Sequence, residues 1–578
     1  MDMSVTTISS NEHIDTEQSF RVSAGPGAGK THWLVKHIRH ILRDSTRLGT
    51  TKNIACITYT NVGVETIKAR LASDVGRVEV RTIHSFLYRF IVKPYLSFID
   101  PSLGLNITKV DGHDDHVPSR SKIIEWVKTH PQKTSLKHPF SEKQLTRLPD
   151  NIANLRRWLR YIYYRYDAAS GQFVPFLDEN KGYQSRLNKH VVSTLKTDVM
   201  AYKRQYWKQG ILHHDDVLFF SHHLIQRYPS LLNVVRSRFP YFLVDEFQDT
   251  SPIQSIILSL IGQSETMVGV IGDECQSIYG FTGADFSQHR AFSLPNIKDF
   301  AIKDNRRSTN NIIELLNNVR TSLHQNGIRN EQGTKPVLMV GDKMDCYQEV
   351  GRRISEIELC SLTRQNVTTN ALRNEIDPSS VQGDLFQKMT ESDPNSDRKL
   401  WIKSLVEAVV YAREGRFKEA LKSTKKLGLN KSDGLLTLKR LIDEYDSYCT
   451  KPVSEFYSRV MALQSAPSLS KFRNGKAKTF YDGTTFTELS LCVNLIENDG
   501  LFRTIHKSKG AQFPAVVIML EKEADLEFVY TPKLDTKEEH RIYYVAVSRA
   551  RDHLFVSVPE LSLKVEGKVS SLLEVIRI

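Results

Sequence analysis

The sequence lacks any stretch of apolar residues that is long enough to cross a membrane. A transmembrane helix needs about 20 mainly apolar residues in a row, and no segment of the 578 residues approaches that length. The first 18 residues are polar and partly acidic, without the apolar core of a secretory leader. We therefore expect a soluble, cytoplasmic protein with no membrane partner.

Cysteine is scarce and scattered. The six cysteines occupy positions 56, 275, 346, 360, 449 and 492, so that no two of them form a CxxC pair. This spacing excludes a zinc ribbon and a thioredoxin-like motif. We expect reduced thiols, because disulfide frameworks are rare in large cytosolic proteins.

Basic residues outnumber acidic residues. Lys and Arg total 79 against 66 Asp and Glu, which gives a formal net charge of +13 and a pI near 9.2. This surplus favours a polyanionic partner, with nucleic acid as the first candidate and anionic lipid as the second. The composition is that of a globular protein, with 40% apolar and 25% charged residues. The length predicts roughly four domains.

Strand and helix patterns alternate in two regions, and a long, mainly helical stretch interrupts each region. Such alternation predicts an α/β fold with parallel sheets. The expected boundaries are a flexible tail at 1–18, a first α/β domain at 19–89 and 214–290 with a helical insertion at 90–213, and a second α/β domain at 291–374 and 491–578 with a helical insertion at 375–490. The run RRWLRYIYYRY at 156–166 fits an amphipathic core helix or a contact with nucleic acid.

A glycine-rich turn, AGPGAGKT at 24–31, follows a predicted strand and begins a predicted helix. Small residues allow backbone N–H groups from Gly27 to Thr31 to converge on phosphates, Lys30 adds a cation, and the Thr31 hydroxyl can bind Mg²⁺. Position 24 is Ala where the general pattern has Gly, and a turn without nucleotide is the alternative interpretation. The predicted nucleotide contacts are Ala24, Gly25, Gly27, Ala28, Gly29, Lys30 and Thr31.

Two carboxylates end a second predicted strand, in LVDEF at 243–247. Asp245 can hold Mg²⁺ and Glu246 can polarise a water molecule. A pair of acidic residues after a strand is weak evidence for such a site by itself, since a solvated strand end explains the pair equally well. Together with the glycine-rich turn it indicates a phosphoryl-transfer site.

Eight motifs in order give the chain a family resemblance. They are AGPGAGKT at 24–31, TYTN at 58–61, TIHSF at 82–86, DEFQD at 245–249, GDECQSIYGFTGA at 272–284, NRRS at 305–308, TIHKSKGAQF at 504–513 and EEHRIYYVAVSRA at 538–550. Over almost its whole length the chain resembles superfamily 1 DNA helicases of the UvrD, Rep and PcrA type. The resemblance implies two RecA-like domains, ATP and Mg²⁺ as cofactors, and movement from 3′ to 5′ on DNA.

The resemblance also implies roles for single residues. Gln276 would sense the γ-phosphate, Arg307 and Arg549 would stabilise its charge in the transition state, and Gln512 stands where a glutamate usually meets the ribose. Aromatic and polar residues would hold single-stranded DNA, in part by sequence-tolerant stacking. These positions are Tyr59, Thr60, Asn61, His84, Ser85, Tyr279, Phe281 and His506.

Several positions depart from the family pattern. The glutamine that reads adenine usually lies some twenty residues before the motif lysine, whereas Gln18 lies twelve residues before Lys30. Position 306 is Arg where an aromatic residue usually stacks on the base, and Phe281 and Thr282 replace Trp and Arg. Base selectivity is therefore open, while the phosphate machinery is complete.

Three functions fit these observations. The first is an ATP-dependent helicase or translocase acting on single-stranded or partly duplex DNA. The second is a DNA- and nucleotide-sensing subunit that unwinds little, similar to the helicase-like subunit of the Gabija anti-phage system, which works with a separate OLD-family nuclease. An RNA helicase is disfavoured by DEFQD, QSIY and TIHKSKG. Nothing after Ala550 resembles a fused nuclease, so that a nuclease would be a separate partner.

Overall fold

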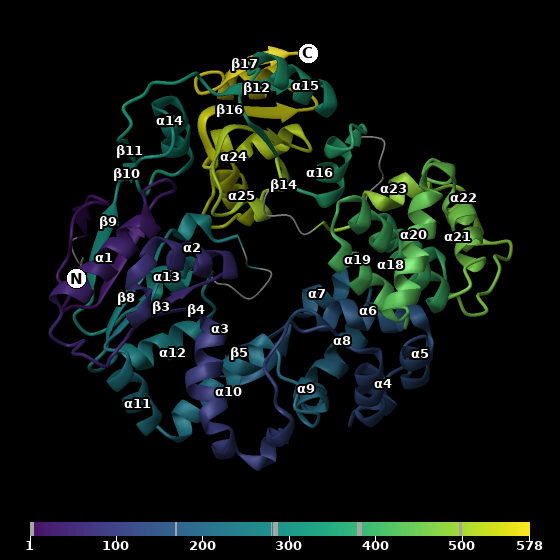
Figure 1. Cartoon of the computed structure of the whole chain (residues 1–578), viewed down its shortest axis with the longest axis horizontal. Helices are drawn as coiled ribbons and strands as arrows, with labels where there is room; N and C mark the ends of the chain where they lie inside the picture. Colours follow the sequence, from purple (N-terminus) through teal and green to yellow (C-terminus); the bar gives the residue numbers. More distant parts are fainter. Residues whose placement is uncertain (1–4, 168–169, 279, 281–286, 379–383, 496–499) are drawn as a thin grey trace. The chain divides into compact units, whose positions relative to one another are not determined.

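The computed structural model (Figure 1) describes residues 5–167, 170–278, 280, 287–378, 384–495 and 500–578. The chain divides into two compact units, one formed by residues 1–333 and 531–548 and the other by residues 334–530 and 549–578. The segment 531–548 thus leaves the second unit and packs in the first. Each unit contains one large parallel sheet, which confirms the predicted α/β class.

The first unit is built on a seven-stranded sheet with the order β1-β9-β2-β8-β7-β3-β4, in which all the pairings are parallel. Its strands are β1 (Thr6–Ile8), β2 (Phe20–Ala24), β3 (Ile54–Thr58), β4 (Val78–Thr82), β7 (Tyr241–Val244), β8 (Met267–Gly272) and β9 (Lys298–Ile302). The central strands β3 and β7 are buried along their whole length, as expected for a parallel sheet covered on both faces.

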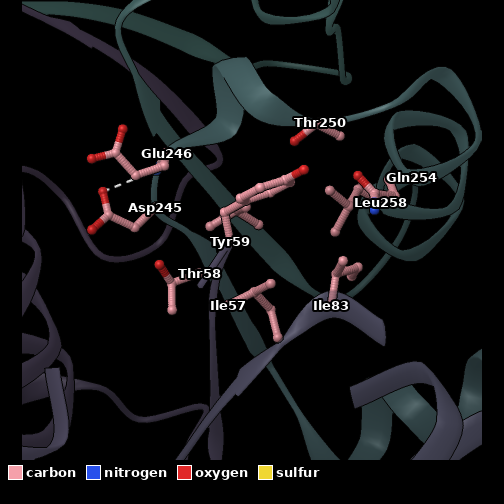
Figure 2. A pocket seen from close by; sticks show the side chains of 10 residues that line it. Ile57, Thr58, Tyr59, Ile83, Asp245, Glu246, Thr250, Gln254 and Leu258 are labelled. Atoms are coloured by element: carbon pink, nitrogen blue, oxygen red, sulfur yellow. Dashed lines mark hydrogen bonds between the residues drawn. The ribbon is translucent and has the colours of Figure 1, made fainter. Parts of the chain in front are cut away.

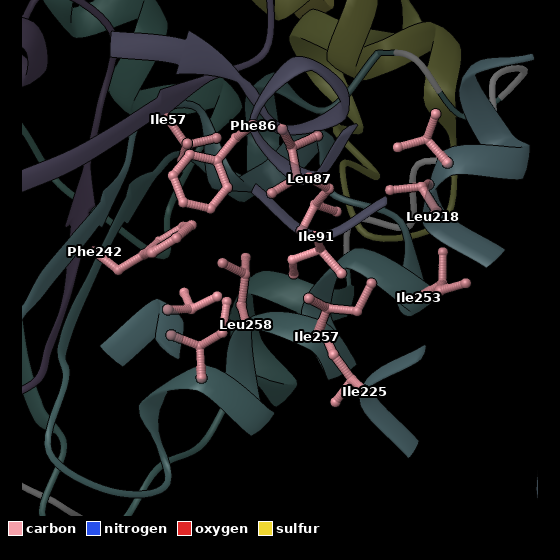
Figure 3. Close-up of a cluster of buried hydrophobic side chains, with 14 of the residues drawn as sticks. Ile57, Phe86, Leu87, Ile91, Leu218, Ile225, Phe242, Ile253, Ile257 and Leu258 are labelled. Carbon is pink, nitrogen blue, oxygen red and sulfur yellow. The ribbon is translucent and has the colours of Figure 1, made fainter. Parts of the chain in front are cut away.

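Successive residues of the central strands face two different cores. Ala55 and Ile57 of β3 join one cluster of buried apolar side chains, and Ile54 and Cys56 join the other. Figure 3 shows part of the first cluster, in which side chains from the sheet meet those of three helices. These helices are α3 (Ile83–Leu87), α10 (His214–Arg227) and α12 (Pro252–Gly262). The opposite face is covered by α1 (Lys30–Asp44) and α2 (Asn61–Leu71).

The amino-terminal segment is part of this sheet, so that the predicted flexible tail is wrong for residues 5–18. Strand β1 pairs with β9, with Thr6 opposite Phe300. Ile8 and Ile14 are buried, and the Trp33 indole N–H donates to the Glu12 carbonyl over 3.0 Å. A three-residue strand gives almost no periodic signal of its own, and its partner lies almost 300 residues along the chain.

The position of β9 also corrects the predicted boundary between the two α/β domains. The sequence predicts that the second α/β domain begins at residue 291, but β9 belongs to the first sheet, and the first unit continues to residue 333. Between residues 230 and 333 the first unit also contains α11 (Ser230–Arg238), α13 (Ser287–Ala291), α14 (Asn310–Val319) and the short paired strands β10 (Asp304–Asn305) and β11 (Asn326–Gly327). The later segment adds α25 (Glu538–Val547).

The insertion at 90–213 has its own apolar core. Its longer helices are α4 (Arg120–Thr129), α5 (Glu142–Arg147), α6 (Pro149–Leu159), α7 (Glu179–Gln184), α8 (Lys189–Leu195) and α9 (Val199–Trp207). The run at 156–166 is helical only up to Leu159, so that the core-helix interpretation, one of the two offered for it, is wrong for the rest of the run. After Leu159 it forms β5 (Ile162–Asp167), which pairs antiparallel with β6 (Gln172–Leu177). Ile162 and Tyr164 are buried at a spacing of two, the period of a strand.

The second unit carries a six-stranded parallel sheet with the order β14-β13-β15-β16-β12-β17. The strands are β12 (Val337–Val340), β13 (Leu359–Thr363), β14 (Phe502–Thr504), β15 (Phe513–Met519), β16 (Ala550–Val558) and β17 (Glu574–Arg577). The helices beside it are α15 (Lys343–Arg353), α16 (Asn366–Arg373), α24 (Glu527–Tyr530) and α26 (Leu563–Val569).

The helical insertion of the second unit, drawn in green in Figure 1, packs around a separate apolar core. It comprises α17 (Leu385–Ser392), α18 (Ser396–Arg413), α19 (Phe417–Lys425), α20 (Lys431–Asp443), α21 (Val453–Met461), α22 (Lys476–Asp482) and α23 (Phe486–Ser490). None of the six cysteines, all of which lie in the described ranges, forms a disulfide bond. No helix in the described ranges is long and apolar enough to span a membrane.

The anchoring of the amino-terminal segment can be tested by Ile14→Ala. Ile14 is 7% exposed in the core, and truncating a buried isoleucine costs about 2–4 kcal/mol of stability. We expect that loss in chemical denaturation followed by circular dichroism. Val5→Ala is the control, since Val5 is 57% exposed and should change stability by less than about 0.5 kcal/mol. Equal stability of the two variants would contradict the anchoring.

Candidate nucleotide and DNA site

The glycine-rich turn lies between the end of β2 and the start of α1. Gly27 and Gly29 adopt left-handed backbone conformations, with φ of +72° and +81°. Gly29 is the N-cap of α1, and no side chain caps that helix end. The first N–H groups of a helix have no partner within the helix and attract anions. The turn therefore has the local structure of a phosphate site.

Two buried amide side chains from the segment after β9 lie against this turn. A Cβ added at Gly27 would lie 2.6 Å from Asn305 Oδ1, and one added at Gly25 would lie 2.5 Å from Gln325 Nε2. Asn305 and Gln325 also both donate to the Pro26 carbonyl, over 3.2 and 2.9 Å. Glycine is thus required at positions 25 and 27 by close approach, and at 27 by conformation as well.

Lys30 is a buried cation at the start of α1. Its ammonium group donates to the carbonyls of Ala24 and Gly25, over 3.2 and 3.3 Å. Burial lowers the pKa of Lys30, and the carboxylates of Glu246, Asp273 and Asp245 act against that change. A buried ammonium favours further anionic oxygens, which is what a nucleotide phosphate would supply.

Asp245, at the end of β7, lies beside the first turn of α1. The Thr31 hydroxyl donates to Asp245 Oδ2 over 3.2 Å. Burial, followed by the neighbouring Glu246 carboxylate, raises the pKa of Asp245 to about 7, while Lys30 opposes the rise. Mg²⁺ prefers oxygen ligands and is usually held by one or two carboxylates together with substrate phosphates. Thr31 and Asp245 fit that requirement.

Glu246 has an unusual backbone conformation. Its φ of +54° lies in the left-handed region, which is uncommon for a residue with a side chain and is found most often at functional sites. The Glu246 N–H donates to Asp245 Oδ1 over 3.0 Å, and the Gln248 amide donates to the Glu246 carboxylate. The turn therefore holds both carboxylates in fixed directions.

A pocket opens beside these carboxylates (Figure 2). Tyr59 lies across it, between Glu246 and the α12 residues Gln254 and Leu258. The rest of the lining is Ile57, Thr58, Ile83, Val244, Asp245 and Thr250. The pocket thus joins the acidic end of β7 to the TYTN segment, which the sequence predicts to hold DNA.

Gln276 lies in the turn after β8 and is buried. Its amide donates to Asp273 Oδ2 over 2.7 Å. The Asp273 backbone N–H in turn donates to Gln248 Oε1 over 2.9 Å. The DEFQD and GDECQ segments are therefore linked by hydrogen bonds between buried groups.

The two predicted phosphate arginines lie in different units. Arg307 belongs to the first unit, where it donates to the Ser548 carbonyl over 2.6 Å and lowers the pKa of Lys30 through its charge. Arg549 belongs to the second unit, is 2% exposed, and donates to the Ala511 carbonyl over 3.1 Å. Gln512 follows Ala511 and is exposed.

Two family models match the chain. The UvrD/REP helicase N-terminal domain matches residues 7–295, and the UvrD-like helicase C-terminal domain matches residues 415–560. The chain belongs to the UvrD/Rep helicase family. Among relatives, an ATP-dependent DNA helicase PcrA of Staphylococcus epidermidis is 25% identical over 634 residues, covering 94% of this chain and 81% of the relative. The protein of the same name from Staphylococcus aureus is 24% identical over 645 residues, covering 94% and 83%.

Most predicted DNA positions of this UvrD/Rep-family chain follow the ends of β3 and β4. Tyr59 is half-buried, while Thr60 and Asn61 are exposed at the start of α2, where Thr60 accepts a hydrogen bond from the Gly63 N–H over 3.0 Å. His506 is half-buried in the second unit. Tyr279 and Phe281 lie outside the described residues.

His84 and Ser85 lie in α3, directly after β4. The His84 ring stacks on His214 with centroids 5.2 Å apart. Burial, followed by the charges of His214 and His113, lowers the pKa of His84 to about 3. His84 is therefore neutral at physiological pH and would meet DNA as a ring or a hydrogen-bonding group rather than as a cation. Ser85 Oγ accepts from Arg81 over 3.3 Å.

Sequence reasoning missed several buried polar residues of the site. Arg320 pairs with Asp273 over 2.6 Å, and Arg541 donates to the Ser277 carbonyl over 2.8 Å. Asn305 and Gln325 hold the phosphate turn, as described above. Arg541 and Asn305 stand inside quoted motifs and could have been examined there, whereas Arg320 and Gln325 lie outside every motif.

Gly27→Ala tests whether the turn is a phosphate site. We expect on the order of tenfold weaker binding of a fluorescent ATP analogue, because the new Cβ would meet Asn305 and strain a left-handed residue. Gly76→Ala is the matched control, since a Cβ there meets nothing within 4 Å. Unchanged affinity for Gly27→Ala in an equilibrium titration would rule out this role for the turn.

Proposed function

We propose that the chain is an ATP-dependent DNA helicase that moves on single-stranded DNA from 3′ to 5′. The observation that carries this proposal is the meeting of Lys30, Asp245 and Gln276 in the first unit. They follow β2, β7 and β8, which are neighbours in the sheet order, and ligands of α/β sheets bind beyond the carboxyl ends of such strands. The relatives named DNA helicase PcrA support the same activity.

In this mechanism the protein holds the nucleotide phosphates in place and stabilises their negative charge. Lys30 holds the phosphates, and Thr31 with Asp245 holds Mg²⁺, which would neutralise charge on the phosphate oxygens. Glu246 accepts a proton from the attacking water while its carboxylate is held by Gln248. Arg307, together with Arg549 and Gln276, stabilises the charge that spreads over the transferred phosphoryl group.

Hydrolysis would drive stepping through different affinities for DNA in the two nucleotide states. The DNA contacts proposed are Tyr59, Thr60, Asn61, His84, Ser85, Tyr279, Phe281 and His506. Stacking on aromatic rings accepts every base, so that a motor can move without reading sequence.

A second candidate is a DNA- and nucleotide-sensing subunit with little unwinding, working beside an OLD-family nuclease in anti-phage defence. The residue at position 306 favours this candidate, because the family usually has an aromatic residue there that stacks on the base. Arg306 stands there, and it donates to Ser10 Oγ over 2.7 Å and to Asp304 over 3.2 Å. An arginine held in this way is not placed as the family's stacking aromatic residue is, which fits a subunit that senses nucleotide rather than one that acts as a motor.

Two assays on the full chain separate the candidates. ATP turnover is measured with and without single-stranded DNA, and unwinding is measured on forked duplexes with a 3′ or a 5′ tail. A helicase gives DNA-stimulated turnover and unwinds the 3′-tailed fork. Strong turnover without unwinding would favour the sensor, and competition with RNA strands tests strand preference.

Lys30→Ala is expected to reduce ATP turnover by on the order of 10²- to 10³-fold. Binding of single-stranded DNA, followed by fluorescence anisotropy, should change little, because Lys30 follows β2 whereas most predicted DNA positions follow β3 and β4. Lys418→Ala removes the same charge from an exposed position on α19 and should leave turnover unchanged. Normal turnover in Lys30→Ala would refute the proposed site.

A further inference from the structure

A buried ion pair lies directly behind the Gln276 turn. Arg320 follows α14 and is 4% exposed, and its guanidinium group is 2.6 Å from Oδ1 of Asp273, which is fully buried. The other oxygen of the same carboxylate accepts the Gln276 amide over 2.7 Å. One carboxylate therefore connects Arg320 to the residue that we propose as the γ-phosphate sensor.

This arrangement fixes the direction of the Gln276 amide. An ionised carboxylate only accepts hydrogen bonds, so that it must face the –NH₂ end of the amide. The –NH₂ group carries two hydrogens, so that one N–H bonds to Asp273 and the other can donate to a second acceptor. Arg320 is the buried cation that pairs with the Asp273 carboxylate, and removing one partner of a buried ion pair is strongly destabilising for the other.

Further contacts hold the same turn from both sides. Asp273 Oδ1 also accepts the Cys275 N–H over 3.1 Å, and the Asp273 N–H reaches Gln248, whose amide holds Glu246. On the other side, Arg320 hydrogen-bonds with Tyr544 of α25. Helix α25 ends beside Ser548, whose carbonyl accepts Arg307.

We propose that Arg320 is a positioning residue for nucleotide hydrolysis, which acts by holding Asp273 so that Asp273 accepts one N–H of the Gln276 amide and the second N–H can donate to the γ-phosphate. The inference rests on the proposed function. Arg320 itself touches neither nucleotide nor DNA in this scheme. Its effect must therefore pass through Gln276, and this requirement makes the role testable.

The test is a double-mutant cycle on the full chain, read as ATP turnover with saturating single-stranded DNA. Arg320→Met should lower kcat on the order of tenfold to a hundredfold. The KM for ATP should change less than threefold, because the Lys30 turn is intact. Gln276→Ala should show a similar loss, and the double variant should be no slower than the slower single variant.

Arg320→Lys and a matched control separate positioning from stability. Lysine keeps the charge but not the planar fork, so that it should recover part of the lost kcat. Arg398→Met breaks a comparable buried pair, since Arg398 lies 2.5 Å from Asp393 in the other unit. It should lower the melting temperature while kcat is retained. If Arg320→Met does not fold, Arg320→Lys replaces it in the cycle.

The possible results of these measurements distinguish the positioning role of Arg320 from the proposed function and from a loss of stability. Losses that multiply in the double variant, or a kcat of Arg320→Met equal to wild type, would overturn the positioning role. Wild-type chain without DNA-stimulated turnover would instead refute the proposed function. An Arg398→Met variant as slow as Arg320→Met would show that lost stability, not orientation, sets the rate.

Discussion

The site depends on the burial of one lysine ammonium group among carboxylates. Lys30 is enclosed at the start of α1, and Asp245, Glu246 and Asp273 act on it through their charges. Lys30 is more than 200 residues from these carboxylates in the chain, yet they meet because β2, β8 and β7 are consecutive in a parallel sheet. The parallel order brings the carboxyl ends of the strands to one edge. The sheet topology is thus what converts three short motifs into one site.

The local parts of this site could be predicted from the sequence, because each depends on a few neighbouring residues. The glycine turn, the acidic ends of β7 and β8 and most strands of both sheets are of this kind. Arg320 and Gln325 could not be predicted, since single buried polar residues carry no pattern and their partners, Asp273 and Pro26, lie far away in the chain. Strand β1 was missed for the same reason, because its only support is the distant strand β9.

The amino-terminal segment contacts the residues around Arg306. Ser9 and Ser10 both donate to Asp304, over 2.9 and 3.2 Å, and Ser10 Oγ also accepts from Arg306. The β1–β9 pairing ends directly before these serines, so that the paired strands fix where Arg306 lies. The segment that the sequence predicts to be flexible therefore shapes the position at which relatives of this family stack the base.

The first unit also contains a physical connection between its acidic and amide groups. Buried hydrogen bonds run from Glu246 through Gln248 to Asp273, and from there to Gln276 and Arg320. Leaving a buried donor or acceptor unsatisfied costs about 1–3 kcal/mol, so that partners in such a network exchange between discrete arrangements rather than by gradual drift. If Gln276 contacts the phosphates as we propose, a change in charge there would reach Asp273, Gln248 and Arg320 through these hydrogen bonds.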